Sequence, residues 1–334
     1  MLDERWSSDA EDIGLALRKM LATESSIERV RQAEARADGR DLQLESSLAE
    51  FGITEMQVEA DVTARIAYEL GRALASVALV ESLPALAVLN LGNVAFGFEG
   101  PVPATLPEVA VRRDDGLYIE TLHGVARRSA AGDFLVEHQP GLSGRRVADM
   151  ATADRMERLM DLVDAARMVG AGQALLQYGI EYANEREQFG RKIGGFQAVA
   201  HKLVDASIAL EGAELLVRKA AFTALESAGG DGAPSPIFAR MVFAKAVEAS
   251  RLVATSVHQV FGGNGFAMEY NVQLFSRRLR SWTMRRHRPG TKLADLARSM
   301  LRSETRDTVR HLWNNDVGLP LPRWAREVDS KARS

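Results

Sequence analysis

The sequence predicts a mainly α-helical protein, with helices toward both ends of the chain and a small β region between them. Apolar residues recur at helical spacing from about residue 10 to residue 89 and again from residue 151 onward, and the stretch between is richer in glycine and proline. We therefore expect an N-terminal helical domain at 1–90, a reduced middle β region at 91–147, a four-helix bundle at 148–325 and a tail at 326–334.

The N-terminal and middle parts differ in the period of their apolar residues. In the first part apolar side chains stand three and four residues apart, which places them on one face of a helix. In the middle part VAVRRDDGLYIETL contains two alternating runs on either side of Asp114, Asp115 and Gly116, which predicts a β-hairpin. The helical series is Leu44, Leu48 and Phe51, followed by Ile66, Leu70, Leu74 and Val77.

Long helices that pack along their length are predicted for the C-terminal part. Two apolar series keep a spacing of three and four residues, as in helical bundles. A third series carries small residues, which permit close helix approach, and a fourth helix is expected to start near Tyr270. The three series are Leu159, Leu162, Ala166, Val169, Leu176 and Ile180; Phe196, Val199, Leu203, Ala206, Leu210, Ala213 and Leu216; and Phe243, Val247, Ser250, Ala254 and Val257.

Composition narrows the class of partner. The 334 residues include 42 basic and 45 acidic side chains, and a formal charge of −3 argues against coating of nucleic acid or an anionic membrane. The absence of cysteine rules out disulfides, thiolate metal sites and a cysteine nucleophile. No signal peptide and no apolar run of about 18 residues is present, so we expect a cytoplasmic protein. The six histidines show no metal-ligand spacing: His123, His138, His201, His258, His287 and His311.

The first candidate site is REQFGRKIGGFQ, which separates two predicted bundle helices. Gly190, Gly194 and Gly195 suit a turn and the start of the next helix, where positive φ or close backbone approach is needed. That explanation leaves out the neighbouring REQF residues. A cation, an amide and an aromatic face at the exposed end of a bundle could hold a phosphate and a flat base, and these are Arg186, Gln188 and Phe189.

A second glycine-rich segment, HQVFGGNGF, ends the third predicted bundle helix. Taken alone, this pattern is best explained as a glycine cap and turn. A Rossmann loop is a poorer explanation, because the glycines follow a helix and not a strand. Gln259, Gly262, Gly263 and Gly265 give this segment the pattern QxxGGxG.

Together the two segments resemble the acyl-CoA dehydrogenase family. The resemblance extends from Tyr182 to Tyr270, and LAEFGI and YELGRALASVALVESL are similar to the family's N-terminal helical domain. It implies that the RxQFG and QxxGGxG residues hold the ADP part of FAD bound mainly to a neighbouring subunit. In that arrangement Arg186 would lie at the diphosphate and Phe189 against the adenine, with polar or close backbone contacts from Gln188, Gln259, Gly262 and Gly263.

The glutamate base of that family has no counterpart at the expected place. The base removes the α proton of the thioester, so it must be a carboxylate that faces the flavin. No Asp or Glu occurs between Tyr270 and Ala294, where the aligned positions hold Arg286 or Pro289. A minority of the family carry the base on an earlier helix, and counting back leads to Met160. A displaced base at Glu157 or Glu185 is the alternative.

The middle region is short and lacks the family's flavin-binding motif. The sequence therefore resembles the shortened, base-less subunit of heteromeric α2β2 dehydrogenases of bacterial steroid side-chain catabolism. The resemblance implies a longer partner subunit that supplies the glutamate, the ring pocket and the acyl-CoA groove, while the bundle helices supply the tetramer core. Two other hypotheses remain, namely a self-sufficient dehydrogenase with a displaced base and an interaction scaffold without flavin.

An arginine run, RRLRSWTMRRHR, falls on the expected fourth helix and its end. One explanation is a solvated helix face or ion pairs to the partner subunit. The other is a phosphate site for FAD or CoA. The arginines are Arg277, Arg278, Arg280, Arg285, Arg286 and Arg288.

Overall fold

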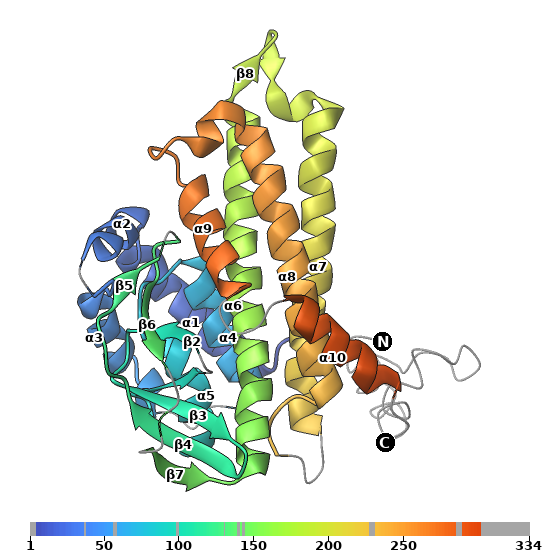
Figure 1. The fold of residues 1–334 in the computed structure, drawn as a ribbon. Coiled ribbons are helices and arrows are strands. Elements are labelled where there is room, and N and C mark those ends of the chain that lie inside the picture. Colours follow the sequence, from blue (N-terminus) through green and yellow to red (C-terminus); the bar gives the residue numbers. More distant parts are fainter. Residues whose placement is uncertain are drawn as a thin grey trace.

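The computed structural model describes residues 5–301 except 37, 56–58, 98–99, 130, 139–140, 142–143, 227–230 and 285–288. Helices α1 to α5 are followed by strands β1 to β7 and then by helices α6 to α10, so the predicted order of helix, strand and helix is confirmed (Figure 1). Within the described residues no helix is long and apolar enough to span a membrane.

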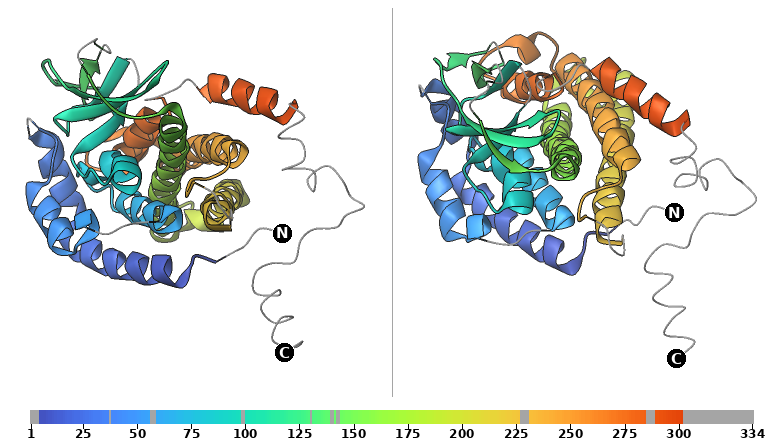
Figure 2. Two further views of the ribbon diagram at one scale, coloured as in Figure 1. Left: turned by 90° about the horizontal axis from the view of Figure 1, so that it is seen from below. Right: turned by 60° about the horizontal axis from the view of Figure 1, so that its bottom comes forward.

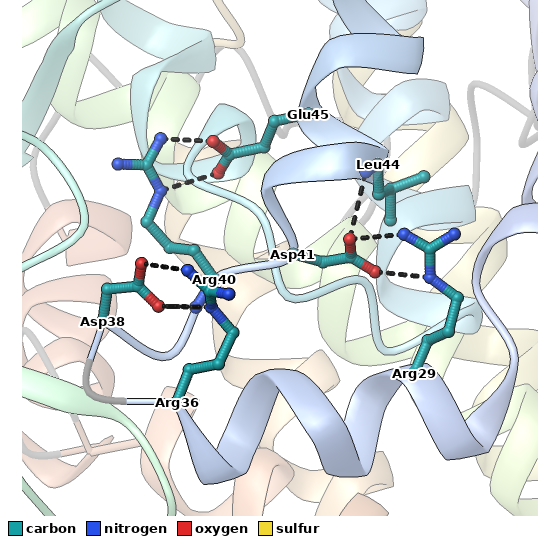
Figure 3. A network of polar contacts seen from close by, with 7 residues as sticks. All are labelled: Arg29, Arg36, Asp38, Arg40, Asp41, Leu44 and Glu45. Atoms are coloured by element: carbon teal, nitrogen blue, oxygen red, sulfur yellow. Dashed lines mark hydrogen bonds and ion pairs between the residues drawn. The ribbon is translucent and has the colours of Figure 1, made fainter.

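Five helices form the N-terminal part: α1 (Ser8–Glu24), α2 (Ile27–Ala35), α3 (Leu42–Glu50), α4 (Ala60–Arg72) and α5 (Leu79–Leu89). Oxygen atoms of Ser7, Ser26 and Asp41 cap the first three helices by accepting backbone N–H groups. The Asp41 carboxylate also accepts hydrogen bonds from Nε and Nη2 of Arg29 at 2.9 and 2.5 Å, so it joins α2 to the start of α3 (Figure 3).

Helix α4 is buried along nearly its whole length and crosses the long helix α6 (Met150–Glu185). Two glycines allow this crossing. A Cβ added at Gly71 would lie 2.1 Å from the carbonyl oxygen of Arg167, and one added at Gly170 would lie 2.0 Å from that of Tyr68. Because the two backbones touch, any larger side chain at either glycine would force the helices apart.

The middle part contains two small sheets. Strands β1 (Val94–Gly97), β3 (Glu108–Arg113), β4 (Gly116–Thr121) and β7 (Arg145–Ala148) form one sheet in that order, and β2 (Gly100–Pro103), β6 (Phe134–His138) and β5 (Arg127–Arg128) form the other. Arg113 pairs with Gly116 across the two-residue turn Asp114–Asp115, which confirms the predicted hairpin. Strands β1 and β3 pair in parallel.

The C-terminal part is built on α6, α7 (Gln197–Glu226), α8 (Pro236–Phe261), α9 (Val272–Trp282) and α10 (Pro289–Leu301). Helix α6 rises about 54 Å over its 36 residues. Figure 2 shows α6 between the N-terminal helices and strands on one side and α7 and α8 on the other. The expected fourth helix starts two residues after Tyr270, as α9.

Candidate functional site

The REQFG segment forms a tight hairpin beyond the end of α6. Strand β8 (Glu187–Gln188) pairs with β9 (Arg191–Lys192), and only Phe189 and Gly190 lie between them. Both turn residues have positive φ, +53° for Phe189 and +76° for Gly190, as a type I′ turn requires. The predicted turn role of Gly190 is thereby confirmed.

Phe189 is a poor choice for a left-handed position, since this turn favours asparagine or aspartate before glycine. Phe189 is nonetheless 93% exposed, and its ring lies edge to face with that of Phe196 at 6.3 Å between centroids. Backbone strain of this kind costs about 1–3 kcal/mol and is concentrated at ligand sites. The turn therefore presents an aromatic face to the outside at a cost in stability.

Two polar residues lie close to Phe189 in the chain. Arg186 is exposed at the C-terminus of α6, and among the residues described it makes no ion pair. Gln188 is also exposed and donates to the backbone oxygen of Glu187 at 2.7 Å. Figure 1 shows the hairpin, labelled at β8, at one end of the bundle. This end therefore carries an exposed guanidinium, an exposed amide and an exposed aromatic ring within four residues.

In the second segment the glycines serve different purposes. Helix α8 ends at Phe261, and Gly262 caps it with φ +57° before the 3-10 turn η3 (Gly262–Phe266). A Cβ at Gly262 or Gly263 would meet nothing within 4 Å, so the backbone there is open to a ligand. Gly265 is buried, and a Cβ on it would lie 3.1 Å from His258. Its missing side chain serves packing.

Aromatic contacts join the two segments. The Tyr182 ring, on the last turn of α6, stacks on Phe261 at 3.8 Å between centroids. The Asn264 amide donates to the Tyr182 hydroxyl at 2.9 Å. The REQFG hairpin and the glycine-rich turn are therefore held at the same end of the bundle, as the sequence comparison implied.

A cleft of about 700 Å³ opens between α8 and α9, and we call it the α8–α9 cleft. Gln259 and Gly262 lie on its wall, and His258 joins its two helices through a hydrogen bond between Nε2 and Ser276 Oγ at 2.8 Å. Burial lowers the pKa of the His258 imidazole against the raising effect of a backbone hydrogen bond of Gly265. The lining residues that the structure describes include no carboxylate: Ser250, Arg251, Ala254, Thr255, His258, Gln259, Gly262, Phe266, Ser276, Leu279, Arg280 and Thr283.

Among the described residues, none of the candidate positions for a catalytic base lines this cleft. Met160 is buried on α6. Glu157 accepts a hydrogen bond from Arg112 of β3 at 3.1 Å, and Glu185 is exposed 28 residues later, about 42 Å along the same helix. Arg286 lies outside the described residues, and Pro289 is the first residue of α10.

A second cavity lies where the N-terminal helices, the strands, α6 and α9 meet, and we call it the central crevice. Its volume is about 60 Å³, far below the roughly 300–1,000 Å³ of ligand pockets. Arg167 of α6 pairs with Glu81 of α5 at 2.7 Å, and its guanidinium lies 3.9 Å from the centre of the Trp282 ring. These side chains close the junction from within.

The described arginines of the run have different surroundings. Arg277 pairs with Glu34 of the same chain at 2.8 Å, and buried Arg278 donates to the Leu74 carbonyl and the Ser76 hydroxyl at 2.9 and 3.1 Å. The expectation of a solvated face is therefore wrong for Arg278, which is buried because α9 packs against the N-terminal part. Arg277 is partly exposed and its ion pair is made within the chain. Arg280 lines the α8–α9 cleft, and 285–288 fall outside the described residues.

Sequence reasoning missed the helix wall of the cleft. Arg251, Thr255 and Ser276 stand in ordinary helical sequence, and no motif marks them. The sequence held one signal for two of them: Arg251 and Thr255 are polar, stand four residues apart and fall outside the apolar series of this helix. Both are exposed in the structure.

Comparison with known proteins agrees with this geometry. Residues 144–286 match the acyl-CoA dehydrogenase C-terminal domain. Acyl-CoA dehydrogenase IpdE2 of Mycolicibacterium smegmatis is 28% identical over 218 residues, which cover 63% of this chain and 66% of that protein. The curated relatives with higher local identity are matched over smaller shares of their length, such as 17% of acyl-CoA dehydrogenase FadE34 of Mycobacterium tuberculosis at 34% identity.

Two solved structures match most of the fold. A chain of the ChsE4–ChsE5 complex from Mycobacterium tuberculosis aligns with a TM-score of 0.77 at 19% identity, covering 90% of this chain and all of that one. A chain of the Tcur3481–Tcur3483 steroid ACAD G363A variant aligns with the same TM-score at 18% identity, covering 88% of this chain and 98% of that one. These identities establish the likeness of fold alone.

Proposed function

We propose that this protein is a non-catalytic subunit of a heteromeric FAD-dependent acyl-CoA dehydrogenase. The proposal is supported by the match of residues 144–286 to the acyl-CoA dehydrogenase C-terminal domain and by the likeness of the fold to acyl-CoA dehydrogenase structures. It completes the FAD site of a longer catalytic subunit that oxidises an acyl-CoA to its α,β-unsaturated form. FAD, when bound there, accepts the hydride from the β carbon.

One observation carries this proposal: groups that fit the ADP part of FAD lie together at one end of the bundle, beside a cleft whose described lining residues include no carboxylate. The Arg186 guanidinium suits a diphosphate, and the exposed face of Phe189 suits a planar adenine. Gln188 and Gln259 add amide groups, and the open backbone at Gly262 and Gly263 admits close approach. None of these groups can abstract a proton from a thioester at neutral pH.

The central crevice supports a shared flavin. A flavin ring held by this chain alone would need space beside the strands, and the Glu81–Arg167 pair and Trp282 leave about 60 Å³ there. The ring and the acyl chain would then be enclosed by the partner subunit. This observation, with Glu157 bound to Arg112, argues against a self-sufficient enzyme.

The proposed assembly is an α2β2 heterotetramer with its core formed by bundle helices. Val204 and Ile208 lie one turn apart on α7 and are 53% and 63% exposed, so this bundle helix presents apolar side chains to another subunit. The structure similar in fold from Mycobacterium tuberculosis is a complex of two proteins, ChsE4 and ChsE5. For the substrate, a steroid side-chain CoA thioester is suggested by the steroid enzyme Tcur3481–Tcur3483.

The test is co-expression with a longer acyl-CoA dehydrogenase chain encoded beside this one. We expect a yellow, active complex of both chains, and little flavin absorbance from this chain purified alone. Arg186→Gln should strip FAD from the complex, whereas Arg145→Gln, an exposed arginine on β7, should retain it. A lone chain that is fully loaded with FAD and oxidises an acyl-CoA would refute the proposal, and an Arg186→Gln complex with normal flavin would favour the scaffold hypothesis.

A further inference from the structure

The α8–α9 cleft extends well beyond the glycine-rich turn. From the bridge between His258 and Ser276, α8 runs back toward its start and α9 runs toward its end. Arg251 lies seven residues before His258, about 10 Å along the helix, and Arg280 lies four residues after Ser276, about 6 Å along its helix. One arginine from each helix therefore lines the far part of the cleft.

No described acidic side chain balances the charge in this part of the cleft. Arg251 and Arg280 are both exposed, and within the described part of the chain neither forms an ion pair. The arginines near α2 and α3 differ in this respect, because Arg29 and Arg36 each pair with a carboxylate in the network of Figure 3. Since two cations on one cavity raise its positive potential, the cleft is suited to an anion.

We propose that Arg251 and Arg280 form a phosphate subsite in the α8–α9 cleft, which holds a phosphoryl group of a bound nucleotide. Guanidinium groups bind phosphate oxygens in bidentate fashion, and the hydroxyls of Thr255 and Thr283 line the same cleft as further donors. A volume of about 700 Å³ is typical of a site for such a ligand. The identity of the nucleotide rests on the proposed function: the phosphate belongs either to the partner's FAD or to the CoA thioester.

Titration of inorganic pyrophosphate into the full chain tests the subsite directly, without flavin or activity. We expect Arg251→Gln and Arg280→Gln each to weaken binding about tenfold or more, since each removes a charge-assisted contact. The matched control is Arg145→Gln, which removes the same charge from an exposed strand outside the cleft lining and should bind as the wild type does. Equal affinity of the wild type and the double variant would overturn the proposal.

Two measurements on the complex separate the sources of the phosphate. If it belongs to FAD, the double variant loses flavin on dilution and its KM for the thioester is unchanged. If the phosphate belongs to CoA, the double variant retains flavin and its KM for the CoA thioester rises. If the contacted group is the 3′-phosphate of CoA, the KM for the 3′-dephospho-CoA thioester is the same in the double variant and the wild type. A complex in which neither flavin retention nor either KM changes would refute a nucleotide phosphate as the ligand.

The subsite and the proposed function can fail separately. If co-expression gives no flavin-containing complex but pyrophosphate still binds through Arg251 and Arg280, the shared-flavin function is wrong and the subsite stands. If Arg186→Gln strips the flavin while the cleft variants bind pyrophosphate normally, the function stands and the subsite is wrong.

Discussion

The α8–α9 cleft and the central crevice contain similar side chains and use them in opposite ways. In the crevice Arg167 is paired with Glu81 and covered by Trp282, and about 60 Å³ remains. In the cleft, no carboxylate among the described residues pairs with Arg251 or Arg280, and about 700 Å³ remains. Because a buried charge is costly without a partner while an exposed one stays hydrated, pairing separates the arginines that hold this fold from those available to a ligand.

Removal of one partner of the buried pair should have the largest effect. Arg167→Gln leaves the Glu81 carboxylate buried beside a neutral group, and we expect a loss of about 3–5 kcal/mol in the free energy of unfolding. Urea denaturation measures this loss. The matched control is Arg112→Gln, which breaks partly exposed pairs with Asp154 and Glu157 and should cost less than about 1 kcal/mol. A loss below about 1 kcal/mol for Arg167→Gln as well would show that the crevice pair does not stabilise the fold.

The next comparison uses two arginines on one helix. Burial lowers the pKa of Arg278 to about 10, so it is still charged at neutral pH, and it binds Leu74 and Ser76 of the N-terminal part. Arg278→Gln should cost about 2–4 kcal/mol, because charged hydrogen bonds are lost inside the protein. Arg280→Gln, two residues away in the cleft, should change stability by less than about 0.5 kcal/mol. Thermal unfolding of the two variants would decide this, and a reversed order would break the comparison.

The hairpin offers a smaller effect of opposite sign. Phe189→Asn replaces a bulky residue at φ +53° by one that tolerates the left-handed region, so the free energy of unfolding should rise by about 0.5–1 kcal/mol. The same change removes the exposed aromatic face, and the co-expressed complex should release FAD faster. A variant that is more stable and keeps its flavin would show that the ring has no part in binding.

The smallest effect concerns His258, which lies between the helices of the cleft. In the folded protein, burial holds the pKa of the His258 imidazole below its usual 6.5. The unfolded chain therefore binds this proton more tightly, and folding stability is lost as the pH falls from about 7 through the folded-state pKa. The free energy of unfolding should therefore fall less steeply between about pH 7 and pH 5 in His258→Gln than in the wild type. Identical slopes would contradict a neutral, buried imidazole.

Much of the architecture and one part of the site followed from the sequence, because they depend on local patterns. Apolar spacing gave the helical regions, and the DDG turn gave the hairpin of β3 and β4. The glycine of REQFG marked a turn that indeed needs positive φ at Gly190. The RxQFG and QxxGGxG residues are grouped at one end of the bundle, as the family resemblance implied. Their part in holding FAD stays a prediction.

Other features were decided only by contacts between distant segments. The parallel pairing of β1 with β3, the backbone contact at Gly71 and Gly170, and the burial of Arg278 have no local signal. Arg278 lies at the central crevice, whereas Arg280 lines the α8–α9 cleft. The two differ because successive residues of a helix point about 100° apart, and α9 packs against the N-terminal part on one side and against α8 on another. The sequence alone thus determined which residues could bind an anion, and the packing of α9 against the N-terminal helices and α8 decided which of them are left without a partner.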